Sequence, residues 1–171
     1  LQTRAAEAVA VDPDRCIFLG QVLLDAGEPD LAVTFAQDAI DDSAPWTPQQ
    51  RDGQQLAAQI EQRRGHYAEA LNHWRQCMLV RFHYFQMPDD TAIYLRIPRN
   101  SAYCQAMIAI QGNNRSDLPA LAAQLPALDP EDLSLTLPLI AALTAKGWAP
   151  DARALADAAR APLNAILKDF P

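Results

Sequence analysis

Apolar residues recur every three or four positions along most of the chain, a spacing that places them on one face of an α-helix. Glycines and short polar runs separate the periodic stretches, as in Gly65-His66-Tyr67. Glycine adopts the left-handed conformation that ends a helix, and a small residue one turn into the next helix, such as Ala70, lets two helix axes come close. The pattern therefore predicts an all-α chain of antiparallel helical hairpins.

The hairpins recur at a nearly regular interval. The turn glycines Gly27, Gly65, Gly112 and Gly147 are separated by 38, 47 and 35 residues. Helical solenoids have repeats of roughly 34 residues or more, and insertions in their connections leave the stacking of neighbouring repeats intact. The longer intervals here contain proline-rich connections. The chain is therefore predicted to be a stack of hairpins.

Particular residues match a known repeat motif. In the first hairpin they are Leu19, Gly20, Leu23, Ala32, Ala39 and Ile40, and in the second they are Tyr67, Ala70, Trp74, Cys77 and Met78. In the last hairpin they are Leu139, Leu143, Gly147, Ala152, Ala156 and Ala159. On these residues the chain resembles the tetratricopeptide repeat family, with degenerate repeats. The resemblance implies a right-handed α-solenoid of stacked antiparallel helical hairpins.

The predicted organisation is a single repeat domain over 1–171. Its parts are the second helix of a partial repeat over 1–12, repeat 1 over 13–43, repeat 2 over 48–86, an irregular insertion over 87–98, a degenerate repeat 3 over 99–128, repeat 4 over 131–160 and a capping helix over 162–171. Pro119 and Pro126 are expected to interrupt the second helix of repeat 3. Pro162 is expected to restart the chain as the cap.

The predicted cap carries an apolar stripe, Leu163, Ile166 and Leu167. The stripe can cover the exposed face of the last hairpin, because a solenoid needs a terminal shield. If the stripe stays open instead, it is a surface for a homodimer.

Composition and charge narrow the class of partner. Half of the residues are apolar and one-fifth are charged, as in globular domains. No apolar run approaches the ~20 residues that cross a bilayer, so no membrane insertion is predicted. The net charge of -7 argues against a nucleic acid, whose phosphates are bound by Lys and Arg. A protein or peptide partner is predicted, and the cellular compartment stays open.

The sequence offers little catalytic chemistry. Cys16, Cys77 and Cys104 fall at inward-facing helical positions, where free cysteines pack as small apolar residues. His73 lies four residues before Cys77 and shares its helix face, but a zinc site would need further ligands. No phosphate-binding glycine loop or nucleophile motif is present. We therefore predict no catalytic residue, no cofactor and no metal, and do not expect an enzyme.

Repeats of this family bind peptides in a groove lined by the first helix of each hairpin. The polar groove positions that the resemblance implies are Gln21, Asp25, Gln55, Gln59 and Gln62. Further groove positions are Leu24, Arg99, Ala106, Leu137, Ala141 and Thr144. Glutamine amides suit hydrogen bonding to an extended backbone. Glutamine is also a good helix former, so a plain surface is the alternative.

Aromatic residues are densest in the middle of the chain, between positions 82 and 94. We interpret Tyr84 and Phe85, with Arg81 and Arg99, as a ledge for a peptide or partner helix, because Tyr and Arg dominate binding hot spots. The alternative is a satellite core that holds the insertion against the hairpins.

These predictions converge on a non-catalytic protein-protein interaction module. It would bind a peptide or a partner subunit in its groove or at its irregular aromatic middle. The alternative is a regulatory or substrate-recruiting arm of a larger enzyme whose catalytic domain lies outside these residues.

Overall fold

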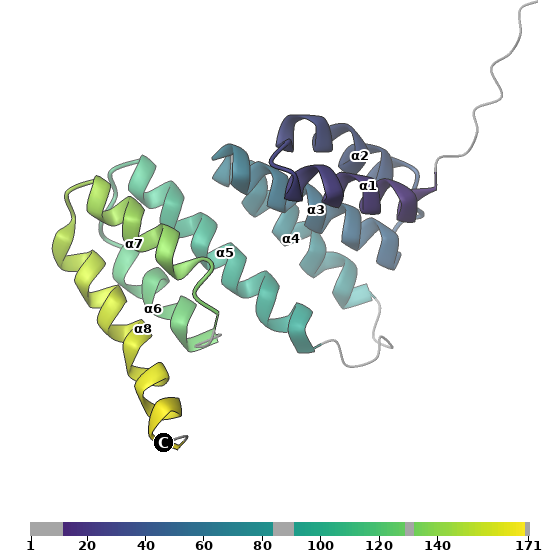
Figure 1. Cartoon of the computed structure of the whole chain (residues 1–171). Helices are drawn as coiled ribbons and strands as arrows, with labels where there is room; N and C mark the ends of the chain where they lie inside the picture. Colours follow the sequence, from purple (N-terminus) through teal and green to yellow (C-terminus); the bar gives the residue numbers. More distant parts are fainter. Residues whose placement is uncertain (1–11, 84–90, 129–131, 170–171) are drawn as a thin grey trace, which may run out of the picture. The chain divides into compact units, whose positions relative to one another are not determined.

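The computed structural model of the chain describes residues 12–83, 91–128 and 132–169 (Figure 1). Within these ranges the chain forms eight helices and no strand, which confirms the predicted all-α class. The helices are α1 (Pro13–Asp25), α2 (Pro29–Asp41), α3 (Pro48–Arg64), α4 (Tyr67–His83), α5 (Thr91–Gln111), α6 (Leu118–Leu128), α7 (Thr136–Ala145) and α8 (Ala149–Asp169). The predicted partial repeat over 1–12 lies outside the described residues except for Asp12.

The helices form two compact units, Leu1–Gln86 and Met87–Pro171. In the first unit each helix packs on the next, and α3 also packs on α1. In the second unit α5 packs on α6 and on α7, while α8 packs on α6 and on α7. The two helices of each hairpin thus pack together, while the single domain over 1–171 stays a prediction.

Capping residues explain where α1 and α3 begin. The Asp12 carboxylate accepts a hydrogen bond of 3.1 Å from the Asp14 N–H, and Pro13 opens α1. The Thr47 hydroxyl likewise accepts a hydrogen bond of 3.3 Å from the Gln50 N–H, and Pro48 opens α3. Side-chain oxygens satisfy N–H groups that have no partner within the helix, and proline fits the first turn because its missing N–H is not needed there.

The turns within the hairpins share one backbone geometry. Gly27, Gly65 and Gly147 have φ between +79° and +84°, as the sequence predicts. The third turn differs, because Asn113, with φ of +56°, takes the left-handed place expected of Gly112. In all four turns the next N–H bonds back to the carbonyl five residues earlier, over 2.8 to 2.9 Å. This arrangement satisfies the last carbonyls of the preceding helix.

Small residues let the helices of the first unit come close. A Cβ added to Gly20 of α1 would lie 2.6 Å from Leu56 Cδ2 of α3, and one added to Gly53 of α3 would lie 3.1 Å from Ile40 Cγ1 of α2. Ala70 of α4 is fully buried. The cysteines Cys16, Cys77 and Cys104 are all buried and free, which confirms their predicted inward orientation.

Prolines end fewer helices than the sequence predicts. Within the expected insertion over 87–98 the chain is already helical from Thr91, and α5 continues through Pro98. An internal proline removes one backbone hydrogen bond, and the well-buried face of α5 beyond it, including Ala102 and Ala106, compensates for that loss.

The second helix of repeat 3 is likewise uninterrupted. Pro119 lies in the first turn of α6, where proline is tolerated, and Pro126 lies within its last turn. Repeat 4 ends in one continuous helix, α8, in place of a helix ending near 160 and a separate cap over 162–171. The side chains of the expected cap stripe lie outside the described residues.

Candidate functional site: outward faces of the first helices

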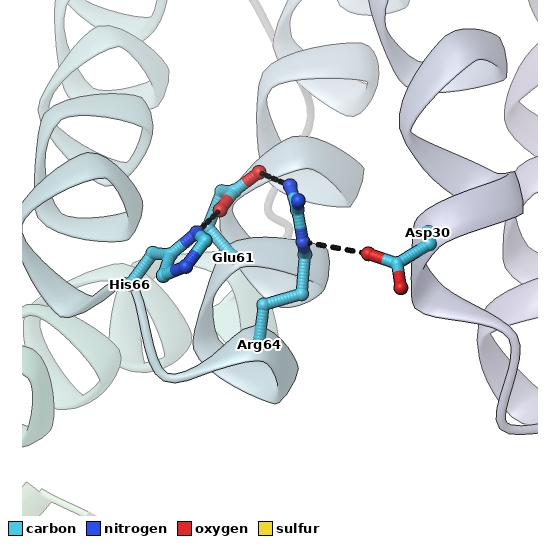
Figure 2. Close-up of polar contacts among 4 residues, drawn as sticks. All are labelled: Asp30, Glu61, Arg64 and His66. Atoms are coloured by element: carbon cyan, nitrogen blue, oxygen red, sulfur yellow. Dashed lines mark hydrogen bonds and ion pairs between the residues drawn. The ribbon is translucent and has the colours of Figure 1, made fainter.

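A polar cluster fixes the turn between α3 and α4 (Figure 2). One carboxylate oxygen of Glu61 lies 2.7 Å from Nδ1 of His66, and the other accepts from Arg64 over 2.8 Å. The Arg64 Nε lies 3.0 Å from Asp30 Oδ1, which belongs to α2. Both oxygens of Glu61 are therefore used, and the cluster ties the end of α3 to the start of α2.

His73 and Cys77 make separate contacts between α3 and α4. The His73 Nδ1 lies 2.7 Å from the Gln54 side-chain oxygen, and Cys77 Sγ donates to the Arg51 carbonyl over 3.5 Å. Burial lowers the pKa of His73 and raises the pKa of Cys77 to about 12. Both side chains are therefore neutral near neutral pH, and a neutral thiol is a poor nucleophile.

The other two thiols are equally unsuited to nucleophilic chemistry. Burial raises the pKa of Cys104 to about 12, and burial together with nearby aspartates raises the pKa of Cys16. Among the residues that the structure describes, no group of three or more His, Cys, Asp or Glu side chains is placed to hold a metal ion.

The glutamines predicted to line a groove have different roles. Gln21 is half-buried on α1 and donates to the Asp25 carboxylate over 2.9 Å. Gln62 accepts a hydrogen bond of 3.2 Å from the indole N–H of Trp74, which is fully buried, so its oxygen serves packing. Gln55 and Gln59 are half-buried on α3.

Three predicted groove positions are wrong, because Leu24, Arg99 and Ala106 are buried. Arg99 donates to the carboxylate and to the backbone carbonyl of Asp132. This contact lowers the pKa of Asp132 to about 2. The guanidinium therefore joins α5 to the segment before α7 and does not face an open groove.

Apart from Arg99, the residues of the predicted aromatic ledge have side chains outside the described residues. Arg81 lies in the last turn of α4, and its side chain is outside the described residues, as are Tyr84 and Phe85. The binding role of these three residues stays a prediction.

The outward face of α1 carries large apolar side chains. Phe18 is 66% exposed and Val22 is 49% exposed. They lie four residues apart, so they are neighbours on one face of the helix. The exposed carboxylates of Asp14 and Asp25 lie on the same side, before and after the apolar pair. We call Asp14, Phe18, Val22 and Asp25 the α1 face.

A second apolar surface lies on α7. Leu137 is 58% exposed, and Pro138 and Ala141 are exposed beside it. No residue between Thr136 and Ala145 is charged. Leu137, Ala141 and Thr144, all predicted at groove positions, are indeed exposed.

The sequence prediction missed Phe18 and Val22, although a signal for them exists. Helix α1 carries more apolar residues than its buried side uses. Cys16, Gly20 and Leu24, spaced four apart, form its buried side. Gly20 matches the small position of the repeat motif, so the opposite side, with Phe18 and Val22, can be identified from helical phase alone.

No known protein-family model matches the chain, and no curated protein or solved structure matches it either. In the part of the chain that the structure describes, no helix is both long and apolar enough to cross a membrane.

Proposed function

We propose that this chain is a non-catalytic protein-protein interaction module, built as a right-handed tetratricopeptide-like solenoid. It binds a peptide or partner subunit on the outward faces of the first helices of its hairpins. The exposure of Phe18 and Val22 on α1, a helix that already has a complete buried side, carries the proposal. Large apolar side chains grouped on a surface mark interaction sites, and aromatic residues dominate their binding energy.

The chemistry of the described residues supports a binding surface over a reaction centre. The three thiols are buried and neutral, and the Glu61 and Arg99 side chains are held by hydrogen bonds to neighbouring side chains. The outward face of α1 has apolar side chains flanked by polar ones, which is the usual composition of a protein interface.

Helix α7 supplies a second surface of the same kind. Its uncharged outer side, with Leu137 and Ala141, can receive an apolar segment without desolvating a charge of its own. The α1 face and α7 belong to different compact units, so each is proposed as a surface in its own right.

Affinity capture from a lysate of the source organism tests the proposal. The bait is the full chain, compared with Phe18→Ala/Val22→Ala, with Leu137→Ala and with the control Leu79→Ala. Leu79 lies on α4 and is 48% exposed, a fraction similar to the 49% of Val22. We expect at least one protein captured by the wild type and by the control to be lost from one of the two test variants. Identical capture by all four baits, each shown to be folded by circular dichroism, would contradict the proposal.

A further inference from the structure

The negative charge of the chain is concentrated in the hairpin of α1 and α2. Residues 12–42 contain eight carboxylates and one arginine, Arg15, which gives a net charge of -7. The whole chain also carries -7, so the rest of it is neutral as a sum. The charge that argues against nucleic acids is therefore a local property of one hairpin.

The carboxylates gather at the two ends of this hairpin. Asp12, Asp14, Asp38, Asp41 and Asp42 lie where α1 begins and α2 ends. Asp25, Glu28 and Asp30 lie around the turn that joins the two helices. Asp12 is the N-cap of α1, and Asp38 and Asp42 lie in the last turn and at the C-cap of α2. Phe18 and Val22 lie between the two acidic ends.

Most of these charges have no counter-ion within the described residues. There, Asp30 alone of the eight is in an ion pair, with Arg64. Asp25 and Asp41 accept hydrogen bonds from the neutral amides of Gln21 and Gln37, each over 2.9 Å. Unneutralised charges of one sign repel one another and attract a ligand of opposite sign.

Extending the proposed function, on which this inference rests, we propose that the α1 face binds a basic amphipathic helix. Apolar residues of that helix would cover Phe18 and Val22, and lysines or arginines at both of its ends would meet the acidic ends of the hairpin. Asp14 and Asp25 are separated by 11 positions, or about 16 Å along the helix axis. The partner therefore needs basic residues about three helical turns apart, with an apolar stripe between them.

Charge disfavours the other occupants of this face. A second copy of the chain packed symmetrically would bring a hairpin of charge -7 against another of -7. Residues 1–11 contain one cation, Arg4, and one anion, Glu7, so they offer no net positive charge. A basic partner alone has the complementary sign.

The test uses a synthetic peptide of about 16 residues, long enough to span the hairpin. It has leucines on one helical face and lysines near both ends, and its control has glutamates in place of the lysines. Binding of the labelled peptides to the full chain is followed by fluorescence anisotropy. We expect the lysine peptide to bind at least roughly tenfold more tightly than the glutamate peptide, and its binding to weaken as salt is added.

Matched variants locate the binding. Phe18→Ala/Val22→Ala should weaken binding of the lysine peptide by roughly tenfold, whereas Leu79→Ala should leave it unchanged. Asp14→Asn/Asp25→Asn should weaken binding and flatten its salt dependence. The control Glu69→Gln/Asp157→Asn removes the same number of charges elsewhere and should change neither property.

Several outcomes would overturn the inference. They are equal binding of the two peptides, binding insensitive to Phe18→Ala/Val22→Ala, and a chain dimer in sedimentation that this double variant dissociates. If affinity capture depends on Phe18 and Val22 while the lysine peptide does not bind, the partner is of another chemistry and the proposed function stands. If capture depends on none of the tested residues, the proposed function fails.

Discussion

Individual backbone positions decide where the hairpins turn. Gly65 lies in the left-handed region, where a Cβ is strained, and the N–H of His66 bonds back to Glu61 over 2.9 Å. In the third hairpin Asn113 takes the same conformation, and Gly112 beside it does not. Asparagine tolerates the left-handed region better than other residues with a side chain, so the sequence predicts a turn correctly there but misplaces it by one residue.

Substitution of the turn glycines tests which backbone positions require the left-handed conformation. Gly65→Ala should lower the free energy of unfolding by about 1–2 kcal/mol, because alanine is strained at positive φ. Gly112→Ala should have little effect, since its backbone is not left-handed and the residue is exposed. Urea unfolding followed by circular dichroism provides the comparison. Equal losses for the two variants would contradict the assignment.

The contact between Arg99 and Asp132 should make stability depend on pH. The pKa of Asp132 is lowered from 3.8 to about 2, chiefly by the hydrogen bond from Arg99. A depressed pKa means that the ionised carboxylate stabilises the fold above 3.8 and that this contribution is lost as the pH falls towards 2.

Asp132→Asn should therefore be less stable than the wild type at neutral pH, and the difference should shrink between pH 4 and pH 2. Urea unfolding at a series of pH values checks this expectation. A stability difference that stays constant over this interval would contradict the role given to the Asp132 carboxylate.

At the scale of helices, the hydrophobic period and the caps predict that a helix is present better than they predict where it begins and ends. Both helices of the first hairpin lie within the range 13–43 predicted for repeat 1, with Pro13 at the start and Gly27 at the turn. Pro98 misled the prediction of α5, because tertiary packing offsets the hydrogen bond that an internal proline loses. A local sequence pattern contains no information on such packing.

Packing between α3 and α4 is tested by enlarging one small residue. Ala70 is fully buried, so Ala70→Leu should overpack the contact and cost about 1–3 kcal/mol of stability. Ala68, two residues earlier on the same helix, is exposed, and Ala68→Leu should change stability by less than about 0.5 kcal/mol. Thermal unfolding of both variants makes the comparison, and equal melting temperatures would show that the helix phase is misassigned.

At the scale of the whole molecule, the candidate binding surface was only partly predictable. Gln21 and Asp25 were expected to line a groove, and they lie beside the exposed Phe18 and Val22 on α1. Arg99 was expected in a groove and is buried, because its partner, Asp132, is 33 residues away in sequence and no local pattern connects the two. Helical phase identifies faces, but long-range contacts decide which of them stay open.

The surface charge acts on the same scale. The hairpin over 12–42 carries a charge equal to that of the whole chain, so long-range attraction of a cationic partner would be directed to one end of the first unit. Phe18 and Val22, the exposed apolar pair on α1, lie within the negative electrostatic field of this hairpin.

Photo-crosslinking from position 18 is the most direct measurement. Benzoylphenylalanine replaces Phe18 in the full chain, and in a control it replaces Leu79, which is also exposed. After irradiation in the source lysate, we expect a discrete crosslinked product with a second protein from position 18 and none from position 79. Absence of a product from position 18, or the same products from both positions, would contradict a partner-binding role for the α1 face.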